Sequence, residues 1–107
     1  MTIIRAYRDN GRIFRVDANG HAGYVSNGPD VVCAAVSTLV QGSLLGLIEI
    51  AKVSVSQIYK DGQLTFTILD SNISTRHSAD IILETMCVAL RDIEKDYPAH
   101  VKLEEIY

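Results

Sequence analysis

The sequence contains no tryptophan, only two cysteines and two prolines, and no excess of basic residues. The two cysteines, Cys33 and Cys87, form no C-x-x-C motif, so neither a zinc ribbon nor a thioredoxin-like redox centre is indicated. Ten basic residues against thirteen acidic ones give a net charge of −3, whereas nucleic-acid-binding domains carry a basic surface. We therefore expect no metal site, no cofactor and no direct contact with nucleic acid.

The N-terminus also lacks the basic region, apolar stretch and cleavage site of a secretory signal. We expect a cytoplasmic protein whose thiols stay reduced. The longest uncharged run, Val31–Ile48, has eighteen residues, which is close to the lower limit for a membrane-spanning helix. Polar residues in its middle, acidic residues at both ends and the absence of a basic cluster argue against a span. We expect instead a central helix that is buried on most sides.

The 107 residues are enough for one domain, residues 1–107. The dipeptides Asn10-Gly11 and Asp61-Gly62 favour two-residue hairpin turns. Together with the hydrophobic periodicity, they predict strands at 2–8 and 12–18, a helix at about 29–52, strands at 53–59 and 64–69, a helix at about 74–96, and a strand at 100–106. The ββαββαβ order predicts an α/β protein of the two-layer α+β type, with two helices on one mixed sheet.

The same periodicity predicts which residues face the core. In the second strand, Phe14, Val16 and Ala18 are expected to share the more apolar face. In the strand 64–69, the alternate residues Leu64, Phe66 and Ile68 are expected to do the same. Six apolar residues of the second helix recur at steps of three and four and form its expected buried stripe: Ala79, Ile82, Leu83, Met86, Leu90 and Ile93.

Cys33 and His21 are the candidate catalytic residues. A glycine-rich segment runs from Gly20 to Gly28 and leads into the helix that carries Cys33. Thiol chemistry needs thiolate, but a free cysteine with a pKa of about 8.5 is only about 3% ionised at pH 7. A helix N-terminus contributes about 0.3 to 1 kcal/mol, whereas an imidazolium about 4 Å away contributes roughly 4 kcal/mol at an effective dielectric of 20. We predict Cys33 as nucleophile and His21 as the base that later protonates the leaving amine.

Asp30 and Ser37 lie three residues before and four residues after Cys33, so they share its helix face. Asp30 either orients the imidazole or caps the helix, and capping is favoured. Ser37 either bonds the Cys33 carbonyl, which is favoured, or lines the substrate cleft. Tyr24 is a loop anchor or a substrate contact.

Other assignments are open for the histidines and thiols. A cysteine in an apolar run is more often inert core, and this is the expectation for Cys87. His77 is expected to be solvated. The spacing does not support a metal site built from His21, Cys33 and either His77 or His100. A redox sensor that uses Cys87 as the resolving thiol is the least favoured hypothesis.

Gly20-His21-Ala22-Gly23-Tyr24, the segment from Asp30 to Ser37 and the ββαββαβ order together resemble the ribosomal-processing cysteine proteases of bacteria, over essentially all of the chain. The resemblance implies an endopeptidase that removes a short N-terminal extension from large-subunit ribosomal protein twenty-seven and cuts after an aromatic residue. It implies Cys33 as nucleophile, His21 as base and a homodimer. It also implies a substrate-binding loop that includes Ala22, Gly23, Tyr24 and Gly28. The rival hypothesis is a non-catalytic dimeric ribosome-associated module that holds a peptide without cutting it.

Small residues on the first predicted helix suit a close contact. Gly42 and Gly46 lie four residues apart, with Ala34, Ala35 and Ser43 nearby. Such a surface permits close approach of a neighbouring element, either inside the domain or across the two-fold axis of a dimer.

Overall fold

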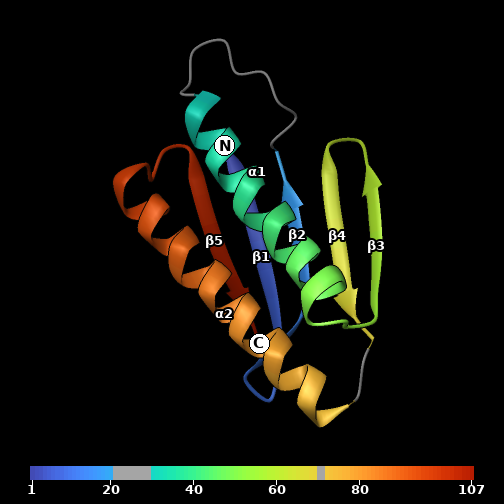
Figure 1. The fold of residues 1–107 in the computed structure, drawn as a ribbon. Helices are drawn as coiled ribbons and strands as arrows, with labels where there is room; N and C mark the ends of the chain where they lie inside the picture. The colour runs from blue at the N-terminus through green and yellow to red at the C-terminus, as the bar shows by residue number, and fades with distance from the viewer. Residues whose placement is uncertain (21–29, 70–71) are drawn as a thin grey trace.

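One five-stranded sheet carries both helices on the same face (Figure 1). The computed structural model describes residues 1–20, 30–69 and 72–107. The elements in chain order are β1 (Thr2–Asp9), β2 (Arg12–Asn19), α1 (Asp30–Leu45), the π-helical segment η1 (Gly46–Ile50), β3 (Val55–Lys60), β4 (Gln63–Ile68), α2 (Ile73–Asp96) and β5 (Val101–Ile106). The predicted ββαββαβ order and two-layer α+β class are confirmed.

The strand order is β3-β4-β2-β1-β5. Three neighbouring pairs are antiparallel, and β1 with β5 is parallel, so the sheet is mixed as predicted. Both hairpin turns have the positive φ angles that their dipeptides favour: 53° and 80° at Asn10 and Gly11, and 54° and 75° at Asp61 and Gly62.

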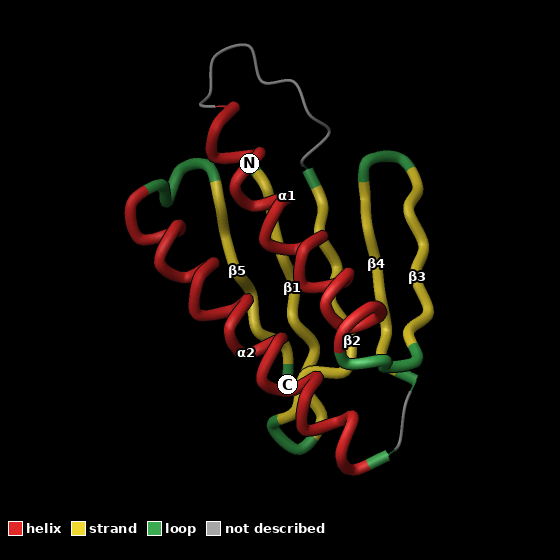
Figure 2. The backbone as a smooth tube through the Cα atoms, in the orientation of Figure 1, coloured by secondary structure: helices red, strands yellow, loops and turns green. Residues whose placement is uncertain are grey.

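The pairing brings three chain segments to one end of the sheet, which we call the site end. The first residue of β1, Thr2, pairs with Val101 of β5, and Ile3 pairs with Asn19 at the end of β2. The first turns of α1 lie over the same end (Figure 2). The end of β2 and the start of α1 therefore lie at the same end of the molecule, although ten residues separate the two elements in the sequence.

A β-bulge in β2 changes which residue enters the core. Tyr7 pairs with Arg15, but Arg8 pairs with Ile13, so Phe14 is an extra residue. Ile13 is 1% exposed, while Phe14 is half-buried and its ring centroid lies 6.4 Å from that of Tyr7. The prediction that Phe14 continues the core face of Val16 and Ala18 is wrong, because strict alternation holds only where no residue is inserted.

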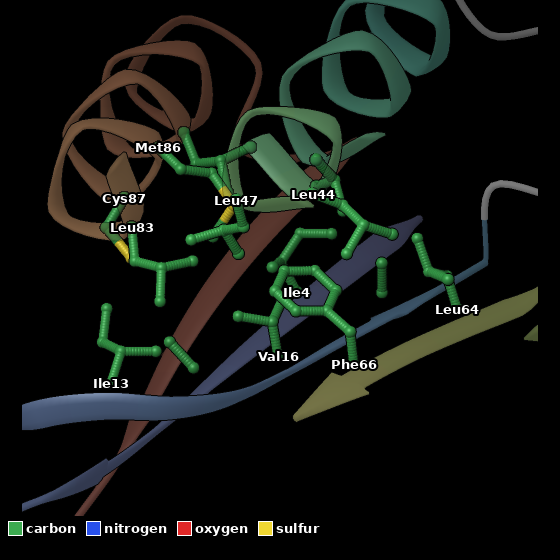
Figure 3. Packing of buried hydrophobic residues seen from close by; sticks show 14 of the residues in the cluster. Ile4, Ile13, Val16, Leu44, Leu47, Leu64, Phe66, Leu83, Met86 and Cys87 are labelled. Carbon is green, nitrogen blue, oxygen red and sulfur yellow. The ribbon is translucent and has the colours of Figure 1, made fainter. Parts of the chain in front are cut away.

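The core lies between the sheet and the helix layer (Figure 3). Leu64, Phe66 and Ile68 of β4 are all buried, which confirms the predicted face. The stripe on α2 is also confirmed, since Ala79, Leu83, Met86 and Leu90 are buried and Ile82 and Ile93 pack against them partly buried.

Hydrogen bonds explain where the predicted element ends shift. The Val53 N–H donates to the Leu47 carbonyl at 2.8 Å, so β3 begins two residues later than expected. The Asn72 side chain accepts from the N–H groups of Ser74 and Thr75, so α2 begins one residue earlier. The predicted single helix at 29–52 is α-helical from Asp30 to Leu45 and continues as η1. Pro29, its expected first residue, lies outside the described residues.

α1 buries one stripe, is half-buried beside that stripe and exposes the opposite face. The buried residues Val32, Val36, Val40 and Leu44 follow a four-residue step. The apolar segment Val31–Ile50 has 20 residues and a hydropathy of 2.0, and 28% of its 18-residue window is buried. By length and composition alone, this segment is apolar enough to cross a membrane. The expectation of a helix buried on most sides is wrong for the single chain, because α1 contacts the sheet below and α2 on one side while its outer face is uncovered.

Candidate active site

Cys33 is the fourth residue of α1 and lies at the site end of the sheet. Its side chain is half-buried, and its Sγ atom is 3.9 Å from Oγ1 of Thr2. Thr2 is only 1% exposed, and its backbone N–H donates to the His100 carbonyl at 2.8 Å. Thr2 was not among the predicted site residues, because 31 positions separate it from Cys33 and no local motif connects them.

Gly20, the residue after β2, also lies at the site end. Its φ of +89° is unfavourable for other residues, and a Cβ atom at this position would lie 2.4 Å from the Met1 carbonyl oxygen. The same Cβ position lies 3.5 Å from the Cα atom of Thr2. Gly20 and the Thr2–Cys33 contact therefore lie together at the site end, and the next residue in the chain after Gly20 is His21.

The predicted site is only partly within the described residues. His21, Ala22, Gly23, Tyr24 and Gly28 lie outside them, so their assignments stay predictions. Asp30 is the first residue of α1, and Ser37 is half-buried one turn beyond Cys33.

The second thiol has a different environment. Cys87 is 0% exposed in the core, and this burial raises its pKa to about 11. Both cysteines are free, and the predicted structural burial of Cys87 is confirmed. A buried thiol with a raised pKa is a poor nucleophile at neutral pH, so Cys87 does not suit the resolving role of a redox sensor.

The two other histidines, His77 and His100, lie in different environments. His77 is exposed on α2, as predicted, and His100 is half-buried at the turn before β5. Within residues 1–20, 30–69 and 72–107, no group of three or more His, Cys, Asp or Glu side chains is placed to hold a metal ion.

Among the grooves lined by described residues, two border α1. One, of about 440 Å³, lies between the C-terminal half of α1 and the β3-β4 hairpin and includes Gln41, Leu45 and Tyr59. The other, of about 460 Å³, lies between α1 and α2, and its lining includes Gly42 and Gly46. The small-residue surface predicted from the sequence thus forms part of an open groove between the helices, and Cys33 lines neither groove.

Comparison with known proteins gives consistent matches along the chain. Residues 1–102 match a family model described as cysteine protease Prp. A ribosomal processing cysteine protease Prp from Staphylococcus aureus is 30% identical over 105 residues, which cover 96% of each chain. The crystal structure of the S. aureus protease with a substrate peptide has a TM-score of 0.86 at 28% identity and covers 98% of this chain and 99% of that one. A second structure, with a covalently linked product peptide, has a TM-score of 0.83 at 30% identity with the same coverage.

Proposed function

Because this chain belongs to the Prp family of cysteine proteases, we propose that it removes the N-terminal extension of large-subunit ribosomal protein twenty-seven and cuts after an aromatic residue. Family membership makes the chain a hydrolase that acts in ribosomal processing. The substrate peptide bound to the S. aureus relative supports a peptide substrate here. We place the reaction in the cytoplasm, where ribosomal precursors are made.

We assign the nucleophile to Cys33 and the general base to His21. The observation that carries this assignment is the half-buried Cys33 at the site end, whose Sγ atom lies 3.9 Å from Oγ1 of Thr2. A Cβ atom at Gly20 would lie 3.5 Å from the Cα atom of Thr2, and His21 is the next residue in the sequence. The covalently linked product peptide in the S. aureus relative supports a covalent mechanism.

The proposed reaction begins with transfer of the Cys33 Sγ proton to His21. The thiolate attacks the carbonyl carbon of the scissile peptide bond, the C–N bond breaks, and His21 returns the proton to the leaving amine. Water, with His21 as base, then hydrolyses the thioester to release the carboxylate product and the free thiol. Unpaired backbone N–H groups at the start of α1 can hold the negative oxygen of the tetrahedral intermediates.

Supporting roles go to the neighbouring residues. We assign Asp30 to capping α1 and Ser37 to a hydrogen bond with the Cys33 carbonyl. The loop with Ala22, Gly23, Tyr24 and Gly28 is assigned to substrate binding. Buried aromatic anchors are a common source of peptide affinity, which agrees with the proposed cleavage after an aromatic residue.

The test is cleavage of the extended ribosomal protein, followed by intact mass. We expect product with wild type and with the matched control Cys87→Ala, and none with Cys33→Ala. His21→Ala should lower the rate by about 10² to 10⁴, the usual contribution of a general base. Full activity in folded Cys33→Ala, or binding without product in wild type, would contradict the proposal and favour the non-catalytic module.

Substrate specificity needs its own experiment. Replacing the aromatic residues of the substrate with alanine should raise KM or lower kcat/KM at least tenfold, because anchor contacts are lost. A scrambled peptide of equal composition is the control. Equal cleavage of the scrambled peptide would show that the assigned specificity is wrong.

We also propose a homodimer that is formed through the outer face of α1. Apart from Asp30, α1 carries no charged residue, and Val31 and Leu45 are 69% and 58% exposed. Exposed apolar surface on a soluble domain marks an interaction site. A two-fold axis would bring the same surface of a second copy onto it.

A further inference from the structure

We propose that the Thr2 hydroxyl belongs to the catalytic site, where it donates a hydrogen bond to Sγ of Cys33 and stabilises the thiolate. This inference rests on the proposed role of Cys33 as nucleophile. It adds a group from the start of β1 to a site that the sequence motifs place only at the end of β2 and the start of α1.

The burial of Thr2 is the first argument. Its side chain is 1% exposed, and buried hydroxyl groups in proteins are nearly always hydrogen-bonded. Among the hydrogen bonds of the described residues, the partner of Thr2 Oγ1 is Sγ of Cys33, at 3.9 Å. A threonine at this position therefore has its polar group directed at the reacting atom.

The rigidity of Thr2 is the second argument. Its N–H donates to the His100 carbonyl, and it pairs in register with Val101 of β5. A β-branched side chain also has restricted χ1 rotation. The hydroxyl is thus held in place by the sheet before substrate arrives, which is the requirement for a preorganised electrostatic contact.

The Thr2 contact changes the ionisation of Cys33 in a direction that depends on two hydrogen-bond strengths. One is the strength of the bond in the thiol form, and the other is its strength in the thiolate form. In the thiol form, either Cys33 or Thr2 can donate, and a thiol is a weak donor and a weak acceptor. In the thiolate form, the Thr2 O–H donates to a negative sulfur, and charge-assisted bonds are roughly twice as strong as neutral ones. The contact therefore favours ionisation. Thr2 keeps its own proton throughout, and the Cys33 proton passes to His21.

The test compares Thr2→Val with Thr2→Ser and the matched control Thr67→Val, a half-buried threonine of β4. The rate of iodoacetamide alkylation at Cys33 is measured against pH, with the adduct located by mass spectrometry. For Thr2→Val we expect the midpoint to rise by about one pH unit, which corresponds to roughly tenfold slower alkylation below it. Thr2→Ser, which keeps the hydroxyl, should stay near wild type, and Thr67→Val should not change.

Peptide cleavage supplies a second readout. Thr2 is too buried to touch substrate, so Thr2→Val should lower kcat and leave KM unchanged. An unchanged or lowered alkylation midpoint in Thr2→Val would overturn the inference. If the core opens in Thr2→Val, seen as alkylation of Cys87, the pair Thr2→Ala and Thr2→Ser gives the same comparison of a missing and a retained hydroxyl. Loss of cleavage in Cys33→Ala, together with an unchanged midpoint in Thr2→Val, would reject the Thr2 role alone. Retained cleavage in Cys33→Ala would reject the nucleophile assignment itself.

Discussion

Burial gives the two thiols of this chain different chemistry. Cys33 is half-buried at the site end, next to a fixed hydroxyl, whereas Cys87 is fully enclosed by the core (Figure 3). Transfer of a thiolate into the core costs solvation free energy, so Cys87 titrates at a pKa of about 11 and stays a neutral apolar side chain. Position in the fold therefore leaves Cys33 partly accessible and keeps Cys87 enclosed.

The raised pKa of Cys87 predicts a loss of stability in base. The unfolded chain ionises this thiol near pH 9.0, whereas the folded chain holds the proton until about pH 11. The unfolded state therefore binds fewer protons in this window, and the free energy of unfolding falls as the pH rises. At about 1.36 kcal/mol per pH unit, wild type should lose about 2 to 3 kcal/mol through Cys87.

Urea unfolding at about pH 8 and pH 11 measures this loss. Cys87→Ala removes the titrating group. Its free energy of unfolding should therefore fall less between the two pH values than that of wild type, and the difference should equal the loss predicted for Cys87. Equal losses in the two proteins would contradict the prediction.

In a single copy of the chain, α1 has an apolar face that no other described element covers. Its buried stripe recurs every four residues, and its opposite face presents Val31, Ala34, Ala35 and Thr38 to solvent. An uncharged, small-residue surface offers few groups that would resist desolvation when a second copy packs against it. This is the physical basis of the proposed homodimer.

Light scattering at micromolar concentration should give about twice the chain mass of 11.8 kDa. Ala35→Glu places like charges near each other across the two-fold axis and should weaken the dimer by more than about tenfold. Ile58→Glu is the matched control, because Ile58 is 62% exposed on β3 and does not line the groove between α1 and the β3-β4 hairpin. A monomeric wild type, or dissociation by both variants alike, would show that α1 is not the interface.

At the scale of the whole molecule, Arg8 joins the sheet to α2 at the end of β1 opposite Thr2. The side chain of Arg8 is 9% exposed and contacts Glu84 of α2 and Glu105 of β5, each at 2.6 Å. Arg91 of α2 binds the other oxygen of Glu105 at 2.9 Å. The hydrogen bond from Arg8 lowers the pKa of Glu84. The cluster therefore holds β5 in its parallel pairing with β1, which positions Val101 and His100 at the site end.

Arg8→Met should reduce the free energy of unfolding by about 2 to 3 kcal/mol. Loss of one partner of a buried ion pair costs about 3 to 5 kcal/mol, and the cost is reduced here because the Glu84 side chain is 44% exposed. The lowered pKa of Glu84 stabilises the fold above its ordinary value near 4.5. This contribution disappears as the pH falls, so the difference between wild type and Arg8→Met should narrow in acid.

Urea unfolding at about pH 7 and about pH 3.5 tests both parts of this prediction. Arg5→Met is the control, since the Arg5–Glu104 pair is about one-third exposed on both sides and should contribute less than about 1 kcal/mol. If the two variants lose the same stability, the Arg8 cluster has no special role.

Features that depend on near neighbours in the chain can be predicted from the amino-acid sequence alone. Asn10-Gly11 and Asp61-Gly62 specify their turns because these residues tolerate positive φ, whatever the rest of the chain does. The three- and four-residue steps of α2 specify its buried face in the same way. The motif around Cys33 and the family match rest on residue types and spacing, which need no tertiary contact.

Tertiary structure decided the features that join distant residues. The strand order, the inserted Phe14 in β2 and the partial burial of α1 depend on how elements pack, and periodicity describes only one element at a time. The contact of Thr2 with Cys33 links positions 31 residues apart. It exists because the parallel pairing of β1 with β5 and the placement of α1 over the site end bring a buried hydroxyl against the sulfur of Cys33.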